Sequence, residues 1–250
     1  MMTSNLVRAI DNIVDFVLPR QCIACGERLA AAERWLCTNC MMRLSLTNAH
    51  TIDENPIEKN FWTVMPIERA TSFFFYDSEL AQRLLFRLKY QHCPDIGTFL
   101  ARMMAQQILD DDAAARQTDG ERSGMFDGID VIVPVPLHWK RRFTRGYNQS
   151  DFVARGISEA TGLPIDRKAV RRVVNNVTQT RLTHQQRRDN VKGIFQLVHP
   201  ERIRGKHVLL VDDVITTGST IAECALEMMK AGDVRFSVIS LAYAGDKFHV

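Results

Sequence analysis

The chain has 250 residues, of which 46% are hydrophobic and 24% are charged, and its formal net charge is +3. A chain of this length can bury a hydrophobic core of its own, and we expect one large domain with a small additional module. The charge is unevenly spread, because residues 131–206 hold 16 Lys or Arg against 5 Asp or Glu. This region therefore carries +11 and the rest of the chain −8, which points to an anionic partner.

The N-terminal run NLVRAIDNIVDFVLP, residues 5–19, is apolar at helical spacing but is interrupted by Arg8, Asp11 and Asp15. It predicts an amphipathic helix, with neither the apolar core of a signal peptide nor a membrane span. We therefore expect a cytoplasmic protein. In that reducing compartment the six cysteines are expected to bind metal or to be buried, and not to form structural disulfides.

Two Cys-x-x-Cys pairs follow, with eleven residues between them: Cys22 with Cys25, and Cys37 with Cys40. Four thiolates at this spacing are typical of a closed, tetrahedral zinc site that stabilises a small module. Two alternatives stay open: a redox function, which needs only one pair, and disulfides, which need an oxidising compartment. The other two cysteines, Cys93 and Cys224, are expected to be small buried residues.

Three regions are expected along the chain: the helix and four-cysteine module (1–45), a linker (46–68) and an α/β domain (69–250). In the domain, strands are predicted at 70–76, 130–136, 207–211 and 234–243, and helices at 79–90, 96–109, 151–162 and 221–232. Residues 110–124 are predicted to be a polar break and 138–150 a basic loop. Apolar strands that alternate with helices predict a doubly wound parallel sheet.

The most informative stretch is HVLLVDDVITTGST, residues 207–220, which joins an apolar strand, two acids and a hydroxyl-rich turn before a helix. Ligands of doubly wound sheets bind at the carboxyl ends of strands. A helix start offers unpaired N–H groups, hydroxyls add donors, and glycine permits close backbone approach. We therefore interpret residues 216–220 as a phosphate-binding turn: Thr216, Thr217, Gly218, Ser219 and Thr220. The turn is distinct from a Walker A loop, because the sequence GxxxxGK[ST] does not occur in the chain.

The acid pair Asp212 and Asp213 stands directly before this turn. Two carboxylates would repel a bare anion, so they require hydroxyl donors or a divalent cation. Ribose with a 5-phosphate fits this pattern, because its ring hydroxyls can face the acids while the turn holds the phosphate. The alternative is that the acids only favour the N-terminus of the next helix.

VLLVDDVITTGST resembles, over its whole length, the phosphoribosyl-pyrophosphate (PRPP) signature of type I phosphoribosyltransferases. At the position of Thr216, 6-oxopurine members of that fold have an Asp that serves the base, whereas orotate-type and glutamine-dependent members have Thr, as this chain does. The resemblance therefore favours a function other than purine-base salvage. Nearly the whole chain also resembles the ComF family, also called GntX. This wider resemblance rests on the two Cys pairs, IVPVPL, RGYNQ at residues 145–149, TQTRLTHQQRRDNVKGIF and the PRPP signature.

The resemblance implies a type I phosphoribosyltransferase-like fold that binds PRPP with Mg²⁺, with Asp212 and Asp213 in binding and catalysis. Residues 138–150 would take the place of the pyrophosphate loop, with Lys140, Arg141, Arg142 and Arg145 near the diphosphate, Gly146 allowing close approach and Asn148 donating. Segment 173–195 would be the flexible catalytic loop, in which Arg187 faces the departing pyrophosphate. Chemistry would rest on positioning and electrostatics.

Three functions are consistent with these features: phosphoribosyl transfer from PRPP with release of pyrophosphate, handling of incoming DNA as the ComF resemblance implies, and regulation through PRPP binding without catalysis. We favour a zinc-containing, PRPP-binding transferase-like protein that acts in DNA uptake (competence) or DNA utilisation. Neither the phosphoribosyl acceptor nor the oligomeric state is predicted. Single-stranded DNA is a predicted partner, with most of its affinity placed on the larger domain. The predicted phosphate contacts are Arg171, Arg172, Arg202, Arg204 and Lys206. Two alternatives stay open for Trp35: it stacks on an unpaired base, or it covers the small zinc core.

Overall fold

The computed structural model describes residues 19–91, 93–120, 123–174 and 193–248. The chain divides into two compact units, Met1–Leu44 and Ser45–Val250. Two predicted features lie outside the described residues: nearly all of the N-terminal amphipathic helix and most of the proposed catalytic loop, including Arg187.

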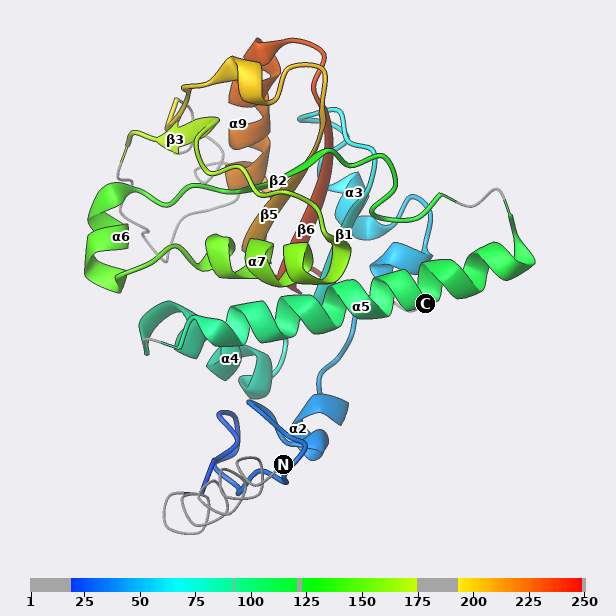
Figure 1. The fold of residues 1–250 in the computed structure, drawn as a ribbon, viewed down its shortest axis with the longest axis vertical. Coiled ribbons are helices and arrows are strands. Elements are labelled where there is room, and N and C mark those ends of the chain that lie inside the picture. Colours follow the sequence, from blue (N-terminus) through cyan, green and yellow to red (C-terminus); the bar gives the residue numbers. More distant parts are fainter. Residues whose placement is uncertain (1–18, 92, 121–122, 175–192, 249–250) are drawn as a thin grey trace, which may run out of the picture. The chain divides into compact units, whose positions relative to one another are not determined.

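The larger unit is built on a four-stranded sheet with the strand order β1-β6-β5-β2 (Figure 1). Its strands are β1 (Ala70–Phe75), β2 (Val131–Pro134), β5 (His207–Ile215) and β6 (Arg235–Tyr243). Every pairing is parallel, so the expected parallel sheet is confirmed. The carboxyl ends of all four strands therefore lie at one edge of the sheet, which is where such folds bind ligands.

Helices cover both faces of this sheet. On one face, α9 (Ser219–Met228) packs Ile221, Cys224 and Met228 against alternate residues of β5, such as Val208 and Leu210. Alternate residues of a strand point to opposite faces, and α7 (Gln149–Thr161) packs against the strands from the other side. α5 (Asp95–Thr118) runs along α7 (Figure 1). The predicted doubly wound arrangement is thus present.

The helices α5 and α7 approach each other closely at Gly156. A Cβ atom added to this glycine would lie 2.2 Å from the carbonyl oxygen of Thr98 and 2.8 Å from Cβ of Ala101. Any larger residue would force the two helices apart, so glycine is required for this contact. The contact fixes the packing of α7 against α5, and the first turn of α7 belongs to the site described below.

The remaining elements connect these layers. α4 (Glu79–Tyr90) joins β1 to α5, and α6 (Trp139–Arg145) joins β2 to α7. β3 (Val170–Arg172) and β4 (Phe195–Leu197) form a separate antiparallel pair. Short pieces complete the described chain: α2 (Thr38–Met42) in the smaller unit, and α3 (Pro56–Lys59), η1 (Ala49–Thr51), η2 (Pro200–Arg202) and η3 (Met229–Ala231) in the larger. Among the described residues, no helix is both long and apolar enough to cross a membrane.

The predicted polar break at 110–124 was wrong in its first half, because α5 continues to Thr118. The last turns of this helix are held by the loop that follows them. The carboxylate of Asp112 accepts a hydrogen bond from the N–H of Met125 at 2.9 Å, and Arg116 pairs with Asp127 at 2.6 Å. These tertiary contacts outweigh the unfavourable run of three aspartates.

The predicted basic loop at 138–150 was also wrong, because it contains the helix α6. The imidazole of His138 caps this helix by accepting from the N–H of Lys140 at 3.2 Å, and Gly146 ends it with φ +82°. The strand β5 is longer than its apolar run, because β6 pairs with it as far as Ile215. Asp212 and Asp213 therefore lie inside the strand and not after it.

Candidate functional site

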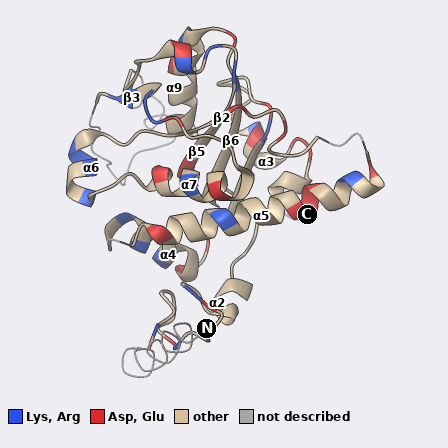
Figure 2. Ribbon diagram, in the orientation of Figure 1, with Lys and Arg blue, Asp and Glu red and all other residues tan. Residues whose placement is uncertain are grey.

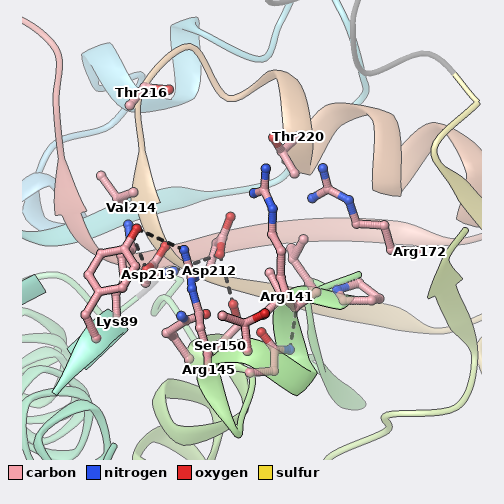
Figure 3. A pocket seen from close by; sticks show the side chains of 17 residues that line it. Lys89, Arg141, Arg145, Ser150, Arg172, Asp212, Asp213, Val214, Thr216 and Thr220 are labelled. Carbon is pink, nitrogen blue, oxygen red and sulfur yellow. Dashed lines mark hydrogen bonds and ion pairs between the residues drawn. The ribbon is translucent and has the colours of Figure 1, made fainter. Parts of the chain in front are cut away.

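A pocket of about 680 Å³ opens at the carboxyl edge of the sheet (Figure 3). Its walls come from the end of α4, the segment from β2 to the first turn of α7, one residue of β3, the end of β5 and the turn that leads into α9. The side chains that line it are Lys89, Tyr90, Val135, Pro136, Leu137, Arg141, Thr144, Arg145, Asn148, Gln149, Ser150, Arg172, Asp212, Asp213, Val214, Thr216 and Thr220.

The acid pair of β5 is held by donors from three parts of the chain. One oxygen of Asp212 accepts from the hydroxyl of Ser150 and from the N–H of Asp213, both at 2.9 Å. The ammonium of Lys89 lies 3.0 Å from Oδ2 of Asp213. Figure 3 draws the contact of Ser150 with Asp212 and that of Lys89 with Asp213. Residues of α4, α7 and β5 thus meet at the two carboxylates.

The charges of the pocket shift the pKa values of its members. Burial, and after it the charge of Asp213, raise the pKa of Asp212 to about 7. Burial lowers the pKa of Lys89, but the charges of Asp213 and Asp212 outweigh it and raise this pKa above its usual value. Burial and the charge of Arg141 lower the pKa of Arg172. Near neutral pH the pocket therefore combines cations with an acid that titrates.

The turn at residues 216–220 shows why glycine is needed there. Gly218 has φ +71° and stands just before the first turn of α9. A Cβ atom added to it would lie 2.6 Å from the ring of Phe61, which is fully buried. The glycine was predicted to allow a phosphate close to the backbone, but at this α-carbon the space is filled by Phe61. The phenyl ring therefore supports the turn from behind.

The hydroxyl residues of this turn divide into two groups. Thr216 and Thr220 line the pocket. Thr217 and Ser219 are not among the lining residues, and their hydroxyls are hydrogen-bonded to each other at 2.7 Å. The N-terminal N–H groups of α9 begin at this turn, so the predicted combination of helix start and hydroxyls is present at the edge of the pocket.

The segment after β2 supplies the basic side of the pocket. Arg145 lies 5.0 Å from the ring of Tyr90 and donates to its hydroxyl at 3.2 Å. Asn148 lines the pocket, and its amide donates to the carbonyl of Val135 at 3.1 Å. Three other predicted residues do not line it: Lys140, whose ammonium lies 5.5 Å from the Trp139 ring centroid, Arg142, and Gly146, which ends α6.

Several pocket residues were missed from the sequence. Lys89 and Tyr90 end an amphipathic helix whose pattern indicates only core packing. Gln149 and Ser150 were placed in the basic loop at 138–150 and given no contact of their own, and Arg172 was taken as a contact for nucleic acid. The side chain of Gln149 is buried, and its amide nitrogen has no hydrogen-bond partner among the described residues. A buried polar group beside a cavity is a signal that only the structure provides.

The smaller unit brings the four predicted cysteines together. The sulfur atoms of Cys22, Cys25, Cys37 and Cys40 all lie within 4.8 Å of one another, and those of Cys25 and Cys37 are 3.7 Å apart. In a tetrahedral four-thiolate zinc site, neighbouring sulfur atoms are about 3.8 Å apart. The donor set and its spacing therefore fit a metal ion such as zinc.

Local hydrogen bonds explain why these cysteines converge. After the first pair the chain reverses at Gly26, which has φ +80°, and Gln21 bridges to Arg28. Before the second pair the carboxylate of Glu33 accepts from the N–H groups of Ala30 and Thr38 at 2.8 and 2.6 Å. The N–H of Cys37 donates to the sulfur of Cys22 at 3.4 Å, and such a hydrogen bond stabilises the thiolate form of Cys22.

The remaining two cysteines do not belong to this cluster. Cys224 is fully buried on the sheet-facing side of α9, as expected. Cys93 is only partly buried.

Comparison with known proteins agrees with this fold. Residues 105–247 match the family model of the phosphoribosyl transferase domain. The DNA utilization protein YhgH of Escherichia coli K12 is 32% identical over 84% of this chain and 85% of its own length. Competence protein F of Haemophilus influenzae is 35% identical over 64% of this chain and 67% of its own length.

Among solved structures, the glutamine PRPP amidotransferase from B. subtilis, complexed with ADP and GMP, matches with 21% identity and a TM-score of 0.35. That match covers 61% of this chain and 30% of the other. The family model and the curated relatives agree with the motifs of the sequence. The chain therefore belongs to the ComF family of phosphoribosyl transferase domain proteins.

Proposed function

We propose that the pocket binds PRPP together with Mg²⁺. One observation supports this most strongly: an acid pair, a hydroxyl-bearing helix start and a group of arginines line a single cavity of about 680 Å³. PRPP carries a ribose diol between a 5-phosphate and a diphosphate, and the acids, the turn and the arginines of the pocket offer one group of side chains for each of these three parts (Figure 3). The carboxylates are also the hard oxygen ligands that Mg²⁺ prefers.

The proposed assignment gives each part of PRPP its own group of residues. Asp212 and Asp213 accept hydrogen bonds from the ribose hydroxyls, and the turn at 216–220 holds the 5-phosphate. The diphosphate lies against Arg141, Arg145 and Asn148, with Arg172 added to the predicted set. Gly146 acts by ending α6, and Lys140 adds positive charge from outside the lining residues.

The reaction that fits this arrangement is phosphoribosyl transfer. The bond between C1 of the ribose and the diphosphate breaks, an acceptor forms a new bond to C1, and pyrophosphate leaves. Positive charge develops on the ribose and negative charge on the leaving group, so Asp212 and Asp213 stabilise one and the arginines the other. Mg²⁺, when bound, neutralises part of the diphosphate charge. Arg187, which lies outside the described residues, is proposed to assist the departing pyrophosphate.

We further propose that the chain acts in DNA uptake or utilisation in the cytoplasm, as the names of its relatives suggest, and binds single-stranded DNA. One observation favours this partner: α6 exposes Trp139 at 65% and Phe143 at 87%, and three consecutive basic residues stand between them in the helix (Figure 2). Exposed aromatic rings between cations are the usual means of stacking unpaired bases while neutralising the backbone.

The basic residues first predicted for DNA are partly engaged elsewhere. Arg202 pairs with the buried Asp166, Arg171 donates to the side chain of Gln196 at 2.8 Å, and Arg172 lines the pocket. Trp35 is only partly exposed. We therefore place the main contact with DNA on α6.

We also propose that the four-cysteine cluster holds Zn²⁺. Three of its cysteines are buried, and the described residues of this unit, 19–44, bury few other apolar side chains, so a bound metal is their main source of stability. A closed set of four protein ligands is typical of a structural site and leaves no position for a substrate.

For the PRPP site, the substitution Asp213→Asn should weaken PRPP binding in the presence of Mg²⁺ by about 1.5 to 3 kcal/mol, because a charged hydrogen-bond acceptor is lost. Isothermal titration calorimetry measures this directly. Asp233→Asn is the matched control, because Asp233 is exposed, lies outside the pocket and has φ +53°, which suits Asn equally. Equal affinities of wild type and Asp213→Asn would contradict the assignment.

PRPP affinity should also rise with pH through about 7, where Asp212 ionises. A raised carboxyl pKa means that the acid is mostly neutral at pH 6 and mostly ionised at pH 8, and only the ionised form is a full acceptor for the ribose hydroxyls. For a pKa of about 7 the ionised fraction grows about tenfold over this range, which sets the upper limit of the expected gain. In Asp212→Asn only the titration of PRPP itself should remain. The proposed role of Asp212 is contradicted if both proteins show the same pH slope.

The purified, reduced protein should contain one zinc ion per chain, measured by elemental analysis. Cys37→Ser removes one of four ligands, so it should lower zinc content and the solubility of the protein. Cys224→Ser serves as the control, because Cys224 lies outside the cluster. A wild-type protein without zinc would show that the cluster has another role.

For DNA, replacement of Trp139 and Phe143 by Ala should reduce affinity for a single-stranded oligonucleotide by about 1 to 3 kcal/mol per stacked base. Trp62→Ala is the control, because Trp62 is half exposed and carries Lys59 at 5.7 Å much as Trp139 carries Lys140. Fluorescence titration at several salt concentrations would measure both. Unchanged binding in the Trp139 and Phe143 variant would remove α6 as the interface.

A further inference from the structure

The last turn of α4 is fixed against the pocket at three points. The hydroxyl of Tyr147 donates to the carbonyl of Leu88 at 2.6 Å, and Arg145 donates to the hydroxyl of Tyr90 at 3.2 Å. Between these two residues, Lys89 reaches Asp213 at 3.0 Å. Because its neighbours on both sides are anchored, Lys89 is held at the acid pair and differs from a mobile surface lysine.

The ion pair of Lys89 and Asp213 is shielded from water. Their side chains are 23% and 10% exposed. Both residues line the pocket, and Figure 3 shows Lys89 pointing to the acids from the opposite wall. A buried carboxylate requires a compensating cation, and here the chain supplies it from a distant part of its own sequence.

This arrangement leaves little room for a second cation on the same oxygen. Divalent metal ions bind carboxylate oxygens at about 2.0 to 2.2 Å, which would bring the ion close to the ammonium that already lies 3.0 Å from Oδ2 of Asp213. Two cations at that separation repel each other strongly in a site with limited access to water. Lys89 and a metal ion bound by the ligand-free protein are therefore alternatives at Asp213.

We propose that Lys89 is the resident cation of the acid pair: it takes the position at Asp213 that a protein-bound divalent ion would occupy, and it offers its remaining N–H donors to the oxygen atoms of a phosphorylated sugar in the pocket. An ammonium has three donors, and one contact goes to Asp213. The second part of this inference rests on the proposed function, whereas the first part concerns the ligand-free protein alone.

The first part is tested by titrating the ligand-free, full-length, zinc-loaded protein with Mn²⁺ and following its electron paramagnetic resonance signal. Wild type should show no Mn²⁺ ion that depends on Asp213. Lys89→Met, which keeps length and removes charge, should gain one Mn²⁺ per chain, and adding Asp213→Asn should abolish that gain. Lys89→Arg should behave as wild type, since the charge is kept.

Two results would overturn the first part. One is a wild-type protein that already binds a Mn²⁺ ion removed by Asp213→Asn, and the other is no gain of Mn²⁺ in Lys89→Met. Lys89→Gln provides a second neutral variant if Lys89→Met does not fold, as judged by circular dichroism, and it should show the same gain. Lys59→Met is the control, because Lys59 lies outside the pocket over Trp62.

The second part is tested by calorimetry with PRPP at low and high Mg²⁺ concentrations. Lys89→Met should bind PRPP at least about tenfold more weakly than wild type at low Mg²⁺, because a charged donor is lost. High Mg²⁺ should recover part of this loss, because the ion then takes the freed position. Equal affinity of both proteins at every Mg²⁺ concentration would overturn the second part. Absence of PRPP binding in wild type would instead overturn the proposed function, and the Mn²⁺ titration would still decide the role of Lys89.

Discussion

Two adjacent carboxylates at the buried end of a central strand are the constraint on which the larger unit depends. Asp212 and Asp213 lie in β5, which has neighbouring strands on both sides, so water alone does not solvate them. Each must find donors or cations within the protein. Their contacts help to define the pocket: Ser150 from α7 and the N–H of Asp213 donate to Asp212, and Lys89 from α4 forms an ion pair with Asp213.

The same constraint explains why several elements converge at this edge of the sheet. α4 ends where its last turn can bring Lys89 to the acids, and the segment that begins α7 is fastened to that turn through Tyr147. On the other side, Phe61 fills the space beside Gly218 and supports the turn before α9. The lining of this pocket thus follows from the contacts of the two acids as much as from the arginines around them.

Local patterns predicted what depends on local sequence. The runs of apolar residues predicted β1, β5 and β6, and the amphipathic pattern of residues 79–90 matched α4 to the residue. The Cys spacing predicted the cluster because each pair is a local turn. The path of residues 138–150 was not predicted, because α6 depends on a histidine cap and a terminal glycine within a strongly basic stretch. The extension of α5 depends on contacts with Met125 and Asp127, which no local pattern contains.

The candidate site divides in the same way. The acid pair, Thr216, Thr220, Arg145 and Asn148 belong to contiguous motifs and line the pocket as a group. Lys89, Gln149 and Arg172 enter it through tertiary packing. Lys89 in particular stands at the border of the buried face of α4, beside Leu85 and Leu88, where a lysine normally reaches solvent. Its partner is far away in the sequence, so the ion pair was visible only in the folded chain.

The central claim is that one pocket recognises all three parts of PRPP. A crystal structure of the protein with PRPP and Mg²⁺ tests it most directly. We expect density for the 5-phosphate at the turn of residues 216–220, for the ribose hydroxyls at Asp212 and Asp213, and for the diphosphate beside Arg141 and Arg145. A PRPP molecule bound elsewhere, or bound in this pocket with its 5-phosphate away from the turn, would contradict the account.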